Sequence, residues 1–348
     1  MMKIGTHPIG PGHPCYIIAE LSANHGGDFQ IAADTIRAMK ESGADAVKLQ
    51  TYTADTLTIA CDKPPFQIGG GTLWDGKTLH ELYQEAHMPW DWQPKLMTVA
   101  REIGIDLFST PFDDSAVDFL EGMGVLAHKI ASFEMTDHGL LRKVAATGKP
   151  VIMSTGMAAL EEIEESLAVL KAAHSGPVAL LKCTSAYPAD PAEMNLLTIQ
   201  DMRRRFGVPI GLSDHTMGHT VPVAAVALGA CIVEKHFILD RRQGGPDSTF
   251  SMEPAEFRAM VDAIRVTEAA LGKPDNYAIS EKEAKSKAFR RSLFAVKDIA
   301  AGETFTSDNV RSIRPGHGLA PRELGRVMSS KASTAIERGT PLAESHLS

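Results

Sequence analysis

The chain alternates between short apolar runs and longer segments in which apolar residues recur at helical spacing. Runs of four to six residues rich in Val, Ile and Leu are typical of buried parallel strands, and the longer segments are typical of amphipathic helices. The predicted strands span 16–20, 46–50, 107–110, 127–131, 150–154, 178–183, 209–213 and 231–236. The predicted helices span 31–42, 91–103, 115–123, 139–147, 160–174, 197–206, 221–228 and 254–271. Eight strand–helix repeats predict an α/β fold of the (β/α)₈ or TIM-barrel type.

The alternative for the same pattern is an open, doubly wound sheet, but no Gly-x-Gly-x-x-Gly segment supports it. The pattern changes at residue 279, where a polar and charge-dense stretch without an apolar face indicates a linker. Beyond it, 292–296 and 310–313 are predicted strands. We therefore expect a barrel domain over 1–278, a linker over 279–290 and a small domain over 291–348.

Composition narrows the classes of function. The formal net charge is −8, which disfavours a surface for nucleic acid or anionic membrane, because both need a positive field. The longest nearly apolar run, 221–233, is too short to span a bilayer, and the amino terminus lacks the apolar region of a signal peptide. The four cysteines form no Cys-x-x-Cys pair, which fits a reducing compartment. We expect a soluble, cytoplasmic protein.

Polar residues stand where the predicted strands end, which is where barrel enzymes place their active sites. Lys48 and Lys129 lie at the second and fourth strands. Hydroxyl side chains at the neighbouring ends are Thr110, Ser132, Ser154, Ser185 and Ser213. Together they would suit a phosphate or a carboxylate. A buried lysine could instead form a Schiff base with a keto acid, and this alternative stays open.

His215 and His236 close the seventh and eighth strands. Neighbouring strands lie about 4.8 Å apart, so the two imidazoles could converge on one divalent ion and leave positions open for substrate. The alternative is two unrelated polar histidines. Glu20 and Glu134 are candidate acid–base groups or, alternatively, salt-bridge partners of the two lysines. Lys235 is expected to point out of the barrel, because adjacent strand residues alternate in direction.

Eight motifs in order along the strand ends resemble the sialic acid synthase family. They are AELSANHG (19–26), VKLQT (47–51), FSTPF (108–112), KIASFE (129–134), STGM (154–157), KCTSAYP (182–188), GLSDH (211–215) and EKHF (234–237). RRSL (290–293) and RSIRPG (311–316) resemble the small C-terminal antifreeze-protein-like (SAF) domain of that family. The resemblance covers residues from about 14 to 340 and implies a transferase that joins phosphoenolpyruvate to an acetamido sugar.

The resemblance also implies roles for individual residues. His215 and His236 would hold a divalent metal such as Mn²⁺, Mg²⁺ or Co²⁺, and Glu134 would transfer a proton. Phosphoenolpyruvate would be bound by Lys48, Thr110, Lys129, Ser132, Ser154, Ser185 and Ser213. The sugar or metal-bound water would be contacted by Glu20, Gln50, Tyr187 and Asp247.

Two further implications concern the sugar and the assembly. The segments 50–53, 70–85 and 257–265 resemble the branch of the family that uses 2,4-diacetamido-2,4,6-trideoxy sugars, whereas Gly-Pro-Asp at 245–247 is similar to the branch that uses N-acetylmannosamine. The second sugar class, which includes the substrates of neuraminate and legionaminate synthesis, is the alternative. The resemblance further implies a domain-swapped homodimer in which Arg314 of one subunit reaches the sugar in the other barrel. A non-catalytic sugar-binding barrel is the remaining alternative.

Overall fold

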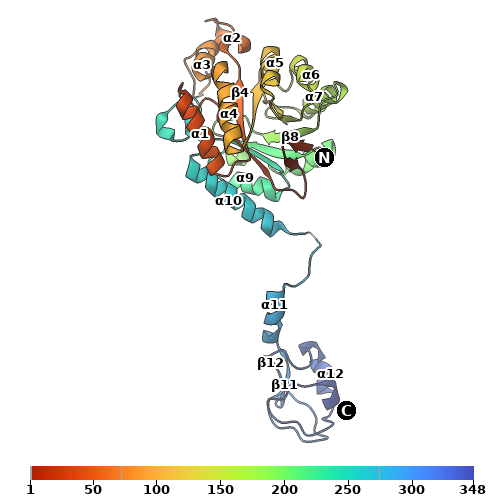
Figure 1. Cartoon of the computed structure of the whole chain (residues 1–348). Helices are drawn as coiled ribbons and strands as arrows, with labels where there is room; N and C mark the ends of the chain where they lie inside the picture. The colour runs from red at the N-terminus through yellow and green to blue at the C-terminus, as the bar shows by residue number, and fades with distance from the viewer. Residues whose placement is uncertain (1, 72, 274) are drawn as a thin grey trace. The chain divides into compact units, whose positions relative to one another are not determined.

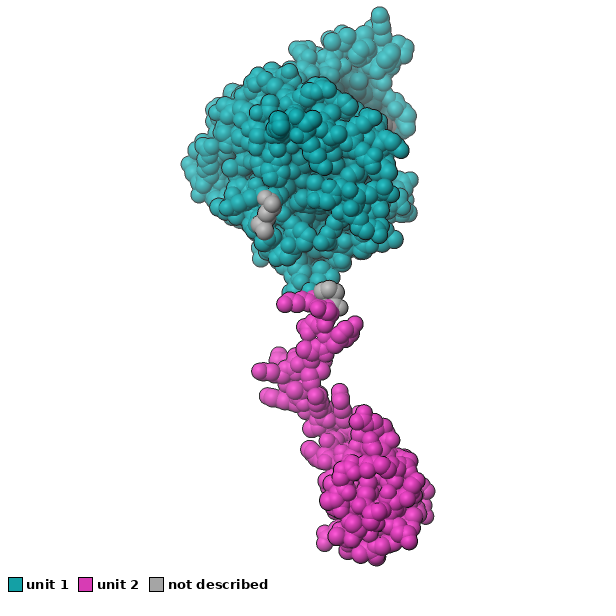
Figure 2. All heavy atoms as spheres, turned by 90° about the vertical axis from the view of Figure 1, so that its right-hand side faces the viewer, with its two compact units in different colours: residues 1–272 teal, residues 273–348 magenta. Residues whose placement is uncertain are grey.

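The computed structural model describes residues 2–71, 73–273 and 275–348. The chain divides into two compact units, Met1–Gly272 and Lys273–Ser348, which are coloured separately in Figure 2. Within the described residues, no helix is both long enough and apolar enough to cross a membrane.

Unit 1 is a closed barrel of eight parallel strands, β3 to β10, as predicted. The strands are β3 (Tyr16–Glu20), β4 (Ala46–Thr51), β5 (Asp106–Pro111), β6 (His128–Ile130), β7 (Val151–Ser154), β8 (Val178–Cys183), β9 (Ile210–Asp214) and β10 (Ile232–His236). β10 pairs with β3 in register, Ile232 opposite Tyr16, and this pairing closes the sheet. The open-sheet alternative is therefore wrong. Most strand residues are buried on both faces, which explains their continuous apolar pattern.

Helices surround the barrel on its outside (Figure 1). Those that follow the barrel strands are α1 (Phe29–Glu41), α4 (Gln93–Ile103), α5 (Asp114–Met123), α6 (His138–Ala145), α7 (Leu160–Ala172), α8 (Thr198–Phe206), α9 (Thr220–Ala227) and α10 (Pro254–Leu271). Local sequence sets their ends. Asp113 caps α5 by accepting from two backbone N–H groups, and Gly124 ends the same helix in the left-handed region that favours glycine.

Three pieces of unit 1 were not predicted. An antiparallel hairpin, β1 (Met2–Ile4) with β2 (His7–Ile9), lies at the amino terminus. Two helices, α2 (Ala54–Leu57) and α3 (Leu79–Ala86), lie in the long segment between β4 and α4. Strands of three residues and a helix of four are too short to establish a hydrophobic period, so the pattern that revealed the barrel could not reveal β1, β2 and α2. α3 has eight residues, as many as the predicted α6 and α9, and was left out of the prediction although its length permitted it.

Unit 2 has its own core. β11 (Ser292–Ala295) pairs antiparallel with β12 (Val310–Ile313), and α12 (Leu324–Met328) packs beside them through the fully buried Val327. α11 (Glu281–Ser286) lies in the segment expected to be a linker and has no buried residue. Short 3₁₀ helices of both units are Pro64–Phe66, Trp90–Trp92, Pro191–Glu193, Arg241–Gln243, Ser248–Phe250, Lys287–Phe289, Pro321–Glu323 and Glu344–His346.

Candidate active site

A cavity of about 550 Å³ opens at the carboxyl ends of the barrel strands and receives side chains from all eight. Fourteen candidate residues were predicted within the barrel, and thirteen of them line this cavity: Glu20, Lys48, Gln50, Thr110, Lys129, Ser132, Glu134, Ser154, Tyr187, Ser213, His215, His236 and Asp247. Ser185 is not a lining residue, although its hydroxyl lies 3.9 Å from the sulfur of Cys183, which is one. Parallel strands closed into a barrel thus bring together residues that are up to 227 positions apart.

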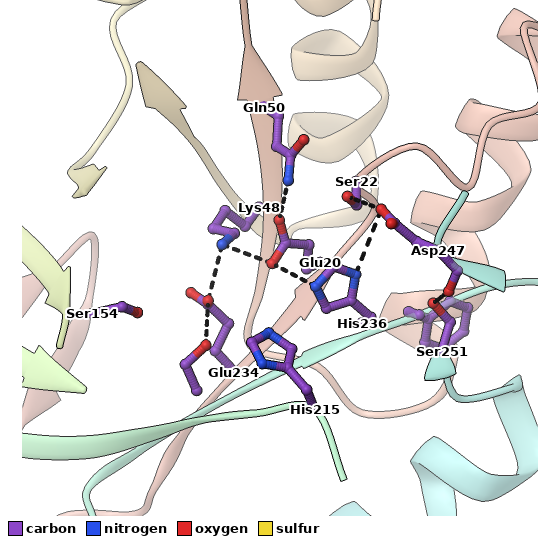
Figure 3. A network of polar contacts seen from close by, with 12 residues as sticks. Glu20, Ser22, Lys48, Gln50, Ser154, His215, Glu234, His236, Asp247 and Ser251 are labelled. Atoms are coloured by element: carbon purple, nitrogen blue, oxygen red, sulfur yellow. Dashed lines mark hydrogen bonds and ion pairs between the residues drawn. The ribbon is translucent and has the colours of Figure 1, made fainter. Parts of the chain in front are cut away.

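The floor of the cavity holds a network of buried charges (Figure 3). Lys48 Nζ lies 2.7 Å from Glu20 Oε2 and 2.9 Å from Glu234 Oε1, and all three side chains are at most 4% exposed. Burial acts to raise the pKa of Glu20, but Lys48 and the nearby His236 outweigh it and hold that pKa at about 2. The two carboxylates in turn raise the pKa of Lys48, against the effect of burial. Glu20 and Lys48 therefore stay charged at neutral pH.

The positive charge of Lys129 is less well balanced by nearby carboxylates than that of Lys48. Its Nζ lies 3.5 Å from Glu234 Oε1, the oxygen that Lys48 also approaches, and it donates to Ser154 Oγ at 2.7 Å. Burial lowers the pKa of Lys129, with Glu234 opposing that effect. An anionic ligand at this position would complete the charge balance of the lysine.

Hydroxyl groups complete the floor. Thr110 Oγ1 is buried and has no hydrogen-bond partner in the described part of the chain. Ser132 Oγ accepts from the backbone N–H of Gly156 at 3.0 Å. A Cβ added at residue 156 would lie 2.8 Å from that Oγ, so glycine is required for this approach. Unpaired hydroxyl capacity beside two lysines suits the oxygens of a phosphate or carboxylate.

The histidine pair lies beside this network, at the ends of β9 and β10. The ring centroids of His215 and His236 are 5.4 Å apart. His215 Nδ1 donates to the carbonyl of Thr184 at 3.0 Å, which makes Nε2 the lone-pair nitrogen of the neutral ring. Burial acts to lower the pKa of His215, but the neighbouring Cys183 raises it. His236 Nδ1 is buried without a hydrogen-bond partner in the described residues, 4.0 Å from Asp247 Oδ2. Asp247 is itself held by the hydroxyl of Ser22.

This donor set fits a divalent ion that takes two ligands from the protein. Among the described residues, no three His, Cys, Asp or Glu side chains are grouped as metal ligands. The two imidazoles are nevertheless close enough to share an ion, and burial lowers the pKa of His236, which favours the neutral ring that metals bind. The remaining positions would belong to substrate and water, as in catalytic sites.

Glu134 stands apart from the charged floor. It lines the cavity just after β6, and its Oε2 is buried with no hydrogen-bond partner among the residues described. Burial raises the pKa of Glu134 to about 7, although Lys129 acts in the opposite direction. A carboxyl with this pKa can both donate and accept a proton near neutral pH.

One side of the cavity is apolar, and it comes from the segment between β4 and α4. The residues of this segment that line the cavity include Leu57, Ile68, Trp74, Leu79 and Leu82. The Trp74 indole N–H donates to the carbonyl of Pro246 at 3.1 Å, and its ring lies 5.9 Å from that of Tyr187. We call this set of five residues the apolar wall.

Sequence reasoning assigned no role to two residues of the cavity, Glu234 and Cys183, and the predicted sugar ligand Arg314 belongs to unit 2. Glu234 holds both lysines, and it could have been found because it lies two positions before His236 and therefore on the same face of the strand. Cys183 is buried and also lines the cavity; burial acts to raise its pKa and His215 lowers it, with a result of about 7. Arg314 lies in unit 2, exposed, directly after β12.

The barrel, its cavity and the small second unit define a class of protein. The chain belongs to the NeuB family, whose model matches residues 35–276, and the SAF domain model matches residues 290–348. The predicted membership of the sialic acid synthase family and the predicted pairing of a barrel with an SAF domain are thereby confirmed.

Individual relatives are similar over nearly the whole chain. A pseudaminic acid synthase of Campylobacter jejuni is 46% identical over 95% of this chain and 96% of its own. An N,N'-diacetyllegionaminic acid synthase of Legionella pneumophila is 37% identical over 99% of this chain and 97% of its own. The crystal structure of an N-acetylneuraminic acid (sialic acid) synthetase of Leptospira borgpetersenii has a TM-score of 0.73 and 32% identity, covering 82% of this chain and 94% of the other.

Proposed function

We propose that this chain condenses phosphoenolpyruvate with 2,4-diacetamido-2,4,6-trideoxy-L-altrose to give pseudaminic acid and phosphate. The observation that carries the proposal is the division of the cavity into a floor of two buried lysines with hydroxyls and an apolar wall. An anionic donor suits the floor, and a deoxy sugar suits the wall. The similarity to pseudaminic acid synthases, 42% to 46% identical, supports the same choice.

In this reaction C3 of phosphoenolpyruvate forms a bond to the aldehyde carbon of the open-chain sugar. Water adds at C2 of the former phosphoenolpyruvate, and the bond from C2 to the phosphate oxygen breaks as phosphate leaves. Lys48 and Lys129 would neutralise the donor's charge. The hydroxyls that would orient it are those of Thr110, Ser132, Ser154, Ser185 and Ser213.

Glu20 and Glu134 would have different roles in the reaction because their surroundings give their carboxyl groups different pKa values. Glu20, with a pKa of about 2, stays ionised, holds Lys48 in place and accepts from the Gln50 amide at 2.9 Å. Glu134, with a pKa of about 7, would carry the proton at its free Oε2. The salt-bridge alternative thus suits Glu20, and the proton-transfer role suits Glu134.

His215 and His236 would hold the divalent ion, for which Mn²⁺, Mg²⁺ and Co²⁺ are the candidates. When bound there, such an ion would act as a Lewis acid toward an oxygen that gains negative charge. Asp247 and Tyr187, whose ring lies 4.4 Å from that of His215, would contact the sugar beside it.

Phosphate release measured across a panel of acetamido sugars tests the proposal. Release with at least one of them separates a synthase from a sugar-binding barrel. Treatment with pyruvate and borohydride should leave the chain unlabelled, because a Schiff-base aldolase would be trapped on a lysine whereas a synthase would not.

We expect the 2,4-diacetamido-2,4,6-trideoxy sugar to be preferred over N-acetylmannosamine. In the open chain C6 lies farthest from the aldehyde at C1, so a sugar that reacts at the floor would place its C6 end away from it, and the apolar wall is the surface proposed to receive that end. A methyl group suits that wall, whereas a hydroxymethyl loses its water without gaining a partner. This costs about 1–3 kcal/mol, or roughly ten- to a hundredfold in kcat/KM. Equal kcat/KM for the two sugars, or preference for N-acetylmannosamine, would favour the alternative sugar class.

The working unit would be a dimer in which unit 2 of one subunit covers the barrel of the other. Charge and apolar surface support this arrangement. Residues 273–348 contain 13 Lys and Arg against 9 Asp and Glu, although the chain as a whole is negative. Large exposed apolar side chains follow three barrel strands: Phe133 after β6, Met157 after β7 and Met217 after β9.

Replacing Arg314 with Ala should raise the KM for the sugar about ten- to a hundredfold and leave that for phosphoenolpyruvate nearly unchanged, because a charged hydrogen bond to the acetamido oxygen is lost. Mixing Arg314→Ala subunits with His215→Ala subunits should restore activity, since each hybrid dimer contains one site with both residues intact. Exposed Arg322 of unit 2, changed to Ala, serves as the control. Hybrids as inactive as their parents would argue against a shared site.

A further inference from the structure

A second buried ion pair lies on the faces of β9 and β10 that point away from the cavity. Lys235 Nζ is 2.5 Å from Asp214 Oδ2, and the side chains are 1% and 0% exposed. Adjacent residues of a strand point to opposite faces, and Ser213 and Glu234 both line the cavity. Lys235 and Asp214 therefore lie behind the barrel wall, and no ligand in the cavity can contact them directly.

Each member of this pair is the chain neighbour of one cavity histidine. Asp214 precedes His215, Lys235 precedes His236, and the two are register partners in the β9–β10 ladder. The carboxylate of Asp214 also accepts from the backbone N–H and the hydroxyl of Thr216, both at 3.1 Å. Lys235 donates in addition to the Thr216 carbonyl. The residues before and after His215 are thus bonded to the residue before His236.

The bonds among Asp214, Thr216 and Lys235 lie where the backbone pairing between β9 and β10 ends. The pairing of β10 with β9 ends at Lys235 opposite Asp214, and His215 follows the last residue of β9. The other hydrogen bonds of His215 go to residues beyond the end of β8: its ring donates to the carbonyl of Thr184, and its own carbonyl accepts from the backbone N–H of Ala189. The Asp214–Lys235 pair is therefore a side-chain tie between the two strand ends that carry the histidines.

We propose that Asp214 and Lys235 are positioning residues that set the separation of His215 and His236. The proposal rests on the proposed role of these histidines as ligands of a divalent ion. Two ligands from separate strands bind one ion only if their rings keep a narrow range of separations. The end of β10 stays paired with β3 through His236 opposite Glu20, whereas the register of β10 with β9 ends at Lys235 and Asp214. A buried ion pair contributes little to stability compared with a well-packed apolar pair, whereas its directional bonds fix geometry.

The test is a double variant, Asp214→Asn with Lys235→Met, which removes both charges without leaving either one buried and alone. The dissociation constant for Co²⁺ is measured from the absorption of the bound ion. We expect it to rise about ten- to a hundredfold, the range found when supports of metal ligands are removed. The temperature of unfolding should change far less than in Lys235→Met alone, where the Asp214 charge is left unpaired.

A matched control removes an ion pair at the opposite end of the barrel. Arg265 Nη2 lies 3.2 Å from Asp45 Oδ2, just before the first residue of β4. Asp45→Asn with Arg265→Met should leave the Co²⁺ constant unchanged, even if the protein becomes less stable. A Co²⁺ constant in the Asp214/Lys235 double variant within twofold of wild type would overturn the proposal.

A second readout works without metal. Ring ¹⁵N signals of His215 and His236 in the metal-free protein should shift and broaden in the double variant, because the strand ends that carry the two rings are no longer tied together. If wild-type protein binds no Co²⁺ through His215, the proposed metal site fails, and the positioning role is then decided by the ring signals alone. Identical ring signals in wild type and double variant would count against it.

Discussion

Turnover should fall by about a thousandfold or more when His236 is replaced by Ala, and His215→Ala should have a similar effect. A Lewis acid contributes several kcal/mol to a step in which an oxygen gains charge, and each 1.4 kcal/mol is a factor of ten in rate. The measurement is kcat for phosphate release. Chelation should abolish the activity of the wild type, and Mn²⁺, Mg²⁺ or Co²⁺ should restore it without restoring the variants.

His219 offers a matched control for the two histidines. It is exposed, lies four residues after His215 and precedes the first residue of α9. His219→Ala should keep nearly full activity and the same response to chelation. Full activity of metal-stripped wild type, or of either cavity variant, would remove the basis for the metal site.

The second large effect is expected from Glu134→Gln, which should lower kcat about a hundred- to ten-thousandfold. Gln keeps the shape of the side chain but cannot transfer a proton, and general acid–base catalysis contributes factors of this size. The rate of the wild type should change through an ionisation near pH 7, because burial raises the pKa of Glu134 to about 7. That ionisation should be absent from the residual activity of the variant.

The same pKa predicts a stability effect that needs no substrate. The folded state binds the Glu134 proton more tightly than the unfolded state, whose pKa is near 4.5, so this stabilisation is complete below pH 4.5 and is lost as pH rises through 7. Relative to Glu134→Gln, the wild type should therefore lose about 3 kcal/mol of unfolding free energy when the pH is raised from 4.5 to 8. Urea unfolding at the two pH values measures it.

Glu165→Gln on the exposed face of α7 is the control for both measurements. It removes one carboxylate from the surface and should alter neither the rate nor the pH dependence. A Glu134→Gln variant that retains the ionisation near pH 7 would assign that ionisation to another group.

The barrel could be predicted from sequence because each strand is buried on both faces and each helix on one. A short continuous apolar run and a longer segment of helical spacing therefore follow each other eight times along the chain. The floor of the site could be predicted for a related reason. All parallel strands end on one side, and polar residues at those ends must converge. Glu234 and His236 both face the cavity from β10, but the pairing of Glu234 with Lys48 and Lys129 depends on three separate strands and has no signal in the sequence.

Other parts of the site leave no periodic signal. The apolar wall is built from side chains of a long connection whose short helices have no extended pattern, so only the structure shows that Ile68 and Leu79 meet in one cavity. The pKa of Glu134 depends on burial by residues distant in sequence, which composition does not reveal. The role of Asp247 was available only from family resemblance, since its loop position marks no strand end.

The apolar wall has a consequence for how such enzymes diversify. The groups proposed to handle phosphoenolpyruvate are dispersed over six strands and the loops after them, so no single exchange of sequence can replace them. The wall, by contrast, lies within one contiguous connection between β4 and α4. Recombination or insertion confined to that connection can change which sugar is accepted while the machinery for carbon–carbon bond formation is inherited intact. Recognition of the C6 end of the sugar, as proposed above, would then be separable from the reaction, whereas the sugar contacts proposed for Tyr187, Asp247 and Arg314 lie outside the connection.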